Sequence, residues 1–189
     1  MLIENFNISK HNDICLDVIG QEITQTYSLI EGESSYRIDR EFLFKPKLKD
    51  LLTEIQVCIN TYLNRIDMEP AVVSSSWFNI LGKNGVVKKH RHVESWEDEE
   101  GSVVSGAYYP FVEEDSAELI FSFPDKKVTI TPESGALVIF PSWVDHYTEI
   151  NMSEKRITVS FNTVRKSVVF RKFPESVKMA EERLKNDIS

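Results

Sequence analysis

The sequence predicts an α+β fold in which helices buttress a jelly-roll barrel, that is, a cupin-like double-stranded β-helix. Two observations predict it: a clear amphipathic helix precedes residue 70, and a run of short β-rich segments separated by turn residues follows it. Many short strands at such spacing favour a barrel or sandwich over an alternating α/β sheet. The 189 residues are enough to close one sizeable core, so we expect a single domain.

The clearest helix lies between Pro46 and Ile66, where apolar residues recur at spacings of three and four and the proline suits the first turn. Earlier residues carry weak signals, and we predict only strand pieces and a short helix within residues 13–27. His11 has no obvious partner there and is interpreted as a surface residue. Residues 1–70 are assigned to a helical and mixed support for the barrel.

The β-rich segments after Pro70 are predicted to form the jelly-roll core, residues 71–165. Residues 166–189 are predicted to be a tail whose charged stretch, 174–185, forms a helix packed outside. The expected strands are residues 72–81, 86–92, 103–111, 118–123, 127–130, 136–140 and 156–164.

The composition limits the partners. A net charge of -8 argues against binding nucleic-acid phosphates or anionic membranes. Cys15 and Cys58 lie far apart without metal-ligand spacing, no secretory signal is visible, and no apolar run could span a bilayer. We therefore predict a cytoplasmic protein that binds neither nucleic acid nor membranes, and the sequence is compatible with a homo-oligomer.

The histidines carry the chemical signal. His90 and His92 stand two residues apart at the end of a β-rich segment, so in a strand both imidazoles would point to one face. His146 follows a later strand, which a barrel can bring alongside. Such a pair is by itself more often a surface feature. Two ligands from one strand and a third from a later one, however, are typical of a non-haem iron site with open coordination positions.

An ordered set of motifs between Trp77 and Asn162 resembles a known family. These are Trp77-Phe-Asn79, Gly85, His90-Arg-His92, Ser105-Gly-Ala-Tyr-Tyr109, Gly135-Ala-Leu-Val-Ile-Phe-Pro-Ser-Trp143, His146 and Arg156-Ile-Thr-Val-Ser-Phe-Asn162. The family is that of the 2-oxoglutarate/Fe(II)-dependent oxygenases related to prolyl 4-hydroxylases, of the type found in marine bacteria and their phages. The resemblance implies a dioxygenase that hydroxylates a protein side chain or small metabolite, with Fe(II) and 2-oxoglutarate as cofactors.

The resemblance also implies a cosubstrate site. Arg156 would grip the distal carboxylate of 2-oxoglutarate with its guanidinium fork, which lysine would not reproduce. Thr158 and Tyr109 would add hydroxyl groups to the same carboxylate, and Asn79 is counted with these cofactor-binding residues. The alternatives are a surface salt bridge for Arg156 and a core aromatic for Tyr109.

Two sets of metal ligands compete. The resemblance implies His90, His92 and His146, which would also be the catalytic centre. Most of the wider superfamily uses two histidines and a carboxylate, and the set His92, Glu94 and His146 would supply one. We favour the three histidines because Glu94 begins an acidic turn. Three neutral ligands would leave the +2 charge of the metal uncompensated and so strengthen 2-oxoglutarate binding.

Two other functions fit the same residues. One is a cupin-type three-histidine iron dioxygenase without 2-oxoglutarate, in which Arg156 would hold the substrate carboxylate. The other is a non-catalytic jelly-roll module that binds a sugar or a partner protein. Succinate production tied to oxygen consumption separates the first from the 2-oxoglutarate enzyme, and the metal content of protein purified without air separates the second.

Overall fold

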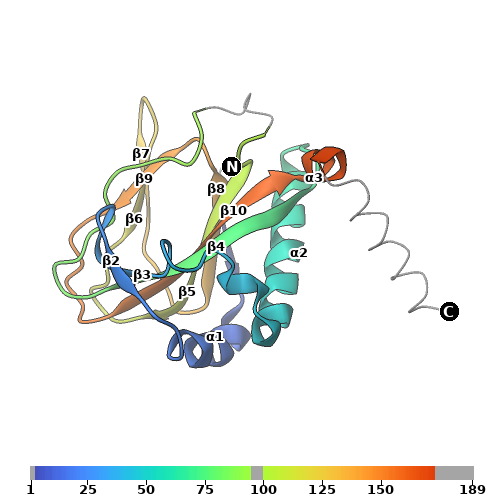
Figure 1. Cartoon of the computed structure of the whole chain (residues 1–189). Coiled ribbons are helices and arrows are strands. Elements are labelled where there is room, and N and C mark those ends of the chain that lie inside the picture. Colours follow the sequence, from blue (N-terminus) through green and yellow to red (C-terminus); the bar gives the residue numbers. More distant parts are fainter. Residues whose placement is uncertain (1–2, 95–99, 173–189) are drawn as a thin grey trace.

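The computed structural model describes residues 3–94 and 100–172, which form two antiparallel β-sheets with helices against the larger one (Figure 1). Within these residues the larger sheet has seven strands in the order β1-β8-β5-β10-β4-β3-β2, and the smaller has three in the order β7-β6-β9. The strands are β1 (Glu4–Asn7), β2 (Gln25–Tyr27), β3 (Ile30–Ser34), β4 (Ala71–Leu81), β5 (Val104–Val112), β6 (Leu119–Ser122), β7 (Lys127–Ile130), β8 (Ala136–Pro141), β9 (Asp145–Thr148) and β10 (Arg156–Arg165). The helices are α1 (Asn12–Ile19), α2 (Lys49–Arg65) and α3 (Lys166–Lys172), with 3-10 turns at Ser9–His11, Phe42–Phe44 and Pro46–Leu48.

The predicted jelly roll is confirmed, and it has a core on each face of the larger sheet. Helices α1 and α2 cover the outer face, where Ile55 and Ile59 belong to the same buried cluster as Val159 of β10. The inner core fills the space between the sheets and includes Phe121 of β6 and Phe140 of β8. Burial of such apolar surface is the main stabilising contribution to a fold of this size.

Most predicted elements are confirmed within one or two residues. The helix expected between Pro46 and Ile66 is a 3-10 turn followed by α2, and its apolar stripe is the buried face. Strands β4, β5, β6, β7, β8 and β10 match six of the seven predicted segments. The tail helix predicted at residues 174–185 lies outside the described residues.

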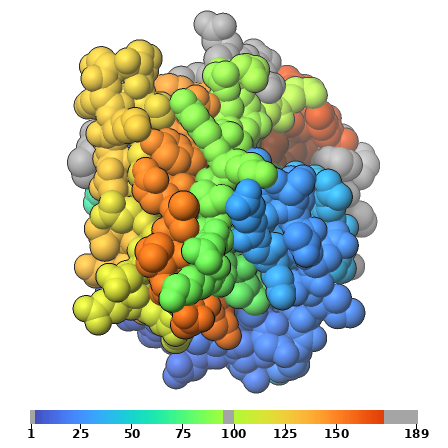
Figure 2. All heavy atoms as spheres, turned by 90° about the vertical axis from the view of Figure 1, so that its left-hand side faces the viewer, coloured from blue at the N-terminus to red at the C-terminus, as the bar shows by residue number. Residues whose placement is uncertain are grey.

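The strand predicted at residues 86–92 is wrong. That stretch makes only isolated bridges, Val87 with Ile30 and His90 with His146. Its backbone hydrogen bonds alternate between the two sheets. The N–H of Lys88 donates to the carbonyl oxygen of Leu29 beside β3, whereas the N–H of Thr148 in β9 donates to the carbonyl oxygen of Val87. We call residues 86–93 the bridging segment, because it joins β3 of the larger sheet to β9 of the smaller one. On the face shown in Figure 2 this green segment lies between the blue N-terminal part and the orange strand region.

The N-terminal part contributes more than support. Strand β1 pairs with β8, and β3 pairs with β4, so the larger sheet begins before residue 70. The surface interpretation of His11 is wrong: it is 8% exposed, and its Nε2 lies 2.6 Å from Oε2 of Glu54 on α2. Local sequence could not show a partner 43 residues away.

Both cysteines are free and buried. Within the described residues, no helix combines the length and the apolar character needed to cross a membrane.

Gly106 provides a test of the packing between β5 and β10. It pairs with Phe161, and a Cβ at Gly106 would overlap the Phe161 ring. We expect Gly106→Ala to destabilise the protein by about 1–3 kcal/mol, the usual cost of overpacking. In urea unfolding, Gly106→Ala and Phe161→Leu should be less harmful together than their separate effects predict, because the smaller side chain makes room for the new methyl group. Strictly additive losses would contradict this account of the contact.

Candidate metal and cosubstrate site

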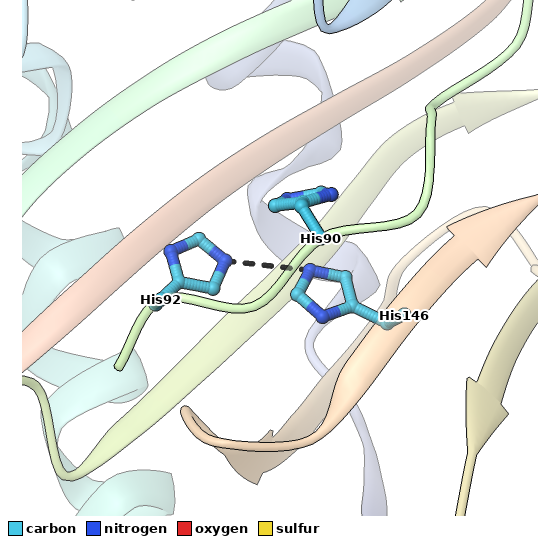
Figure 3. Close-up of side chains that lie close together, drawn as sticks. All are labelled: His90, His92 and His146. Carbon is cyan, nitrogen blue, oxygen red and sulfur yellow. Dashed lines mark hydrogen bonds between the residues drawn. The ribbon is translucent and has the colours of Figure 1, made fainter. Parts of the chain in front are cut away.

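The side chains of three histidines lie close together (Figure 3). His90 and His92 come from the bridging segment and His146 from β9, and one ring nitrogen of each lies within 4.8 Å of the others. The Nε2 atoms of His92 and His146 are 3.3 Å apart. Reciprocal backbone hydrogen bonds of 3.1 and 2.9 Å join His90 to His146. The main chain therefore sets the distance between them, and the prediction that the two histidine segments meet in space is confirmed.

Backbone carbonyl groups orient two of the rings. Nδ1 of His90 lies 2.8 Å from the carbonyl oxygen of Lys88, and Nδ1 of His146 lies 3.0 Å from that of Val144. A carbonyl oxygen only accepts, so each Nδ1 carries the proton and each Nε2 keeps its lone pair. Protein histidines that bind metals are commonly fixed by such a hydrogen bond at the other ring nitrogen.

Burial keeps the imidazoles neutral. Desolvation, together with the neighbouring His90, lowers the pKa of His146 to about 3. The pKa of His92 is held well below its ordinary value by burial and by the two other histidines, and that of His90 is lowered by burial. Because only deprotonated nitrogens bind metals, the cluster has free lone pairs at neutral pH.

The donor set suits a divalent transition metal. Imidazole nitrogens bind iron, zinc, copper and nickel well, and in the described part of the chain the cluster contains imidazoles only. The side chain of Glu94 is 86% exposed, and its carboxylate lies 3.4 Å from the guanidinium of Arg91. Three ligands leave coordination positions open for other molecules.

A buried arginine lies in the same pocket. Arg156 is 2% exposed; it donates hydrogen bonds to Oγ1 of Thr158 at 3.0 Å and to the hydroxyl oxygen of Tyr109 at 3.3 Å. Its Nε is buried without a partner, and among the described residues no carboxylate lies within 4.0 Å. Burial lowers the pKa of Arg156 and raises that of Tyr109, but a guanidinium remains charged at neutral pH. A buried charge without a counter-charge is costly, so the site fits an anionic ligand.

The alternation of residues along β10 turns the side chains of Arg156 and Thr158 toward the pocket. Along β10, Ile157 and Val159 pack toward the helices, and Arg156 and Thr158 line the pocket. Pro110, which lacks an N–H, interrupts the pairing of β5 with β10, whose register shifts between Ile157 and Val159.

Successive side chains of β5 point to opposite faces of the larger sheet. Tyr108 belongs to the outer core, and Tyr109 belongs to the inner core beside Arg156. The interpretation of Arg156 as a surface salt bridge is therefore wrong. Tyr109 is at once a core aromatic and a polar contact.

The pocket measures about 330 Å³, within the usual range for small-molecule sites. The three histidines, Arg156, Thr158, Tyr109 and Asn79 all line it. The Asn79 amide has protein partners at both ends: Oδ1 accepts from Ser34 at 2.7 Å, and Nδ2 donates to Ser160 at 3.3 Å.

Residues 122–162, which include His146 and Arg156, match the family model described as "Putative 2OG-Fe(II) oxygenase". No curated protein matches the chain. A prolyl-4-hydroxylase from Pseudomonas putida is 13% identical, with a TM-score of 0.61 over 87% of this chain and 93% of that chain. The family model matches the part of the chain that carries His146 and Arg156, and the structural likeness shows that the chain shares the fold of this hydroxylase.

Two further solved structures share the fold of this chain. The viral collagen prolyl hydroxylase of Paramecium Bursaria Chlorella virus-1, solved with 2OG, is 13% identical, with a TM-score of 0.61 over 86% of this chain and 96% of that chain. HygX of Streptomyces hygroscopicus, solved with nickel, 2-oxoglutarate and hygromycin B, is 9% identical, with a TM-score of 0.61 over 87% and 83%. At these identities the likeness concerns the fold, and the family resemblance inferred from the sequence is confirmed.

Sequence reasoning missed part of the pocket. Ser160 and Asn162 line it beyond Thr158. Polar residues at every second position of a strand whose other residues are apolar were the available signal. Tyr27 and Tyr36 also line the pocket, and their weakly patterned segment gave no signal.

Proposed function

We propose that this chain is a 2-oxoglutarate- and Fe(II)-dependent oxygenase that hydroxylates a protein side chain or a small metabolite. His90, His92 and His146 hold the iron in this proposal. Arg156, Thr158 and Tyr109 bind the distal carboxylate of 2-oxoglutarate, and Asn79 lines the same chamber.

One observation carries the proposal most strongly: a buried guanidinium without an acidic partner in the described residues shares a pocket with three neutral imidazoles. The imidazoles suit a cation and the guanidinium suits a carboxylate. A ligand with a metal-binding end and a carboxylate at the other end satisfies both, and 2-oxoglutarate has this chemistry.

Bound iron would supply the activation of dioxygen. The chain's own residues position the reactants and exclude water. The backbone hydrogen bonds between His90 and His146 fix the ligand nitrogens, and the guanidinium of Arg156 fixes the far end of the cosubstrate. Such preorganised polar groups reduce the reorganisation needed during reaction.

A cytoplasmic location is also part of the proposal. Cys15 and Cys58 form no disulfide, as is expected of thiols in a reducing compartment. Ferrous iron is favoured there as well.

One observation favours a second function. Among the described residues the histidine cluster has no carboxylate, as the cupin-type three-histidine dioxygenase requires. In that enzyme Arg156 would bind the substrate carboxylate, and no 2-oxoglutarate would be consumed.

Protein purified without air separates these functions. We expect the chain to retain iron, to bind 2-oxoglutarate only when the metal is present, and to form succinate as oxygen is consumed. Calorimetry, metal analysis and succinate quantification measure the three properties. Iron retention without 2-oxoglutarate binding would favour the cupin-type enzyme, and failure to retain iron would favour a binding module.

A further inference from the structure

The N-terminal hairpin supplies a wall of the pocket. Tyr27 ends β2, Leu29 lies in the turn, and Tyr36 follows β3; all three line the same pocket as the histidines. Backbone hydrogen bonds join the hairpin to the bridging segment. The N–H of Lys88 donates to the carbonyl oxygen of Leu29 at 2.9 Å, and the N–H of Glu31 donates to that of Val86 at 2.8 Å. Figure 2 shows this blue region against the green bridging segment. The wall is thus held beside the segment that carries His90 and His92.

Three rings of this wall form a continuous aromatic row, which consists of Tyr27, Tyr36 and Trp77. The rings of Tyr27 and Tyr36 are stacked with centroids 5.0 Å apart, and Trp77 meets Tyr36 edge-on at 4.9 Å. The centroid of Trp77 lies 6.1 Å from that of His92. The row therefore leads from partly exposed tyrosines to the histidine cluster.

Two guanidinium groups lie on the outer part of this row. The Arg37 carbon Cζ is 5.2 Å from the ring centroid of Tyr27, and that of Arg40 is 4.0 Å from the ring centroid of Tyr36. Both residues are exposed. In the described part of the chain neither has a carboxylate within 4.0 Å. A guanidinium stacked on a ring keeps N–H groups along its edge that can bind an anion.

The cationic side chains of the bridging segment, unlike Arg37 and Arg40, have carboxylate partners among the described residues. Lys88 lies 3.5 Å from Glu31, Lys89 lies 3.1 Å from Asp145, and Arg91 is close to both Glu94 and Asp145. Their charges are already compensated. On a chain with a net charge of -8, the uncompensated pair Arg37 and Arg40 gives the aromatic row a local positive charge.

We propose that the substrate carries a carboxylate or phosphate group, which Arg37 and Arg40 bind, and a ring or apolar portion that packs along the aromatic row toward His92. This inference rests on the proposed oxygenase function and adds a substrate class to it. The anion site is distinct from the buried Arg156, which holds the cosubstrate. The N-terminal hairpin then serves as the element of substrate recognition.

Phenyl phosphate combines a ring with an anion and serves as the probe, and benzyl alcohol is its uncharged counterpart. Calorimetry on the anaerobic Fe(II) protein with 2-oxoglutarate already bound measures the affinity for each. We expect phenyl phosphate to bind without displacing 2-oxoglutarate. Its affinity should fall at least about tenfold in Arg37→Gln/Arg40→Gln, the loss expected for charge-assisted hydrogen bonds. Benzyl alcohol should bind both proteins alike.

Lys47→Gln/Lys83→Gln is the matched control, because it removes two exposed, paired charges elsewhere. It should leave phenyl phosphate binding unchanged. Equal affinities in the two double variants, with 2-oxoglutarate still bound, would overturn the inference. Failure of the wild type to bind 2-oxoglutarate is measured separately and would contradict the proposed function instead.

A capped Phe-Asp dipeptide identifies the source of the anion. Tighter binding than phenyl phosphate, lost in Arg37→Gln/Arg40→Gln, would support an acidic peptide substrate. Tighter binding of phenyl phosphate, with the same dependence, would support a small-molecule substrate.

Discussion

Arg156→Met is expected to weaken 2-oxoglutarate binding at least about 100-fold while leaving the ligand-free protein as stable as the wild type or up to about 2 kcal/mol more stable. Removing one partner of a buried charged pair costs about 2–5 kcal/mol of binding. In the ligand-free state the same guanidinium is a buried charge whose Nε has no partner, and replacing it by an apolar side chain removes that desolvation cost. Calorimetry and urea unfolding measure the two effects.

Two further variants sharpen the experiment on Arg156. Arg156→Lys keeps the positive charge but loses the planar pair of N–H donors that a carboxylate accepts. Its affinity for 2-oxoglutarate should therefore lie between those of Arg156→Met and the wild type. Arg65→Met is the matched control for 2-oxoglutarate binding, because Arg65 pairs with Glu4 away from the residues that line the pocket, and its side chain is 60% exposed. Wild-type affinity in Arg156→Met would remove the cosubstrate assignment.

His146→Ala is expected to abolish iron binding. The histidine supplies one of three convergent nitrogens, so its loss should exceed the 10–100-fold effect typical of residues that only support a ligand. The backbone hydrogen bonds between residues 90 and 146 do not require the imidazole, so the fold should persist. Metal analysis after anaerobic purification gives the result, with thermal unfolding as a check on folding.

Glu94→Ala and His90→Ala decide between the two sets of ligands. Glu94 is exposed and paired with Arg91, so Glu94→Ala should retain iron. His90→Ala should lose it. Retention by His90→Ala together with loss by Glu94→Ala would make His92, Glu94 and His146 the metal site.

Patterns that depend on one segment were predictable from the sequence. The apolar stripe of α2 and the apolar strands β4, β5, β8 and β10 carry their own periodicity, because each buries a face against a core. The inward set of β10 could be placed as well, since Arg156 and Thr158 stand two residues apart. Their burial follows from the inward face of the strand.

Features that depend on partners distant in sequence were not predictable. The bridging segment alternates its hydrogen bonds between two sheets, so the β-rich stretch around Val87 does not form a regular strand. Strands β2 and β3 are short and polar, and β2 is an edge strand of the larger sheet; neither gave a signal in the sequence. The aromatic row joins Tyr27 and Tyr36 to Trp77 across some fifty residues. Only the folded chain brings them together.

An anaerobic crystal structure with Fe(II) and 2-oxoglutarate tests the central claim most directly. We expect anomalous scattering to place the iron between His90, His92 and His146, and the distal carboxylate of 2-oxoglutarate to lie against Arg156. Iron bound elsewhere, or a carboxylate that does not contact the guanidinium, would contradict the account.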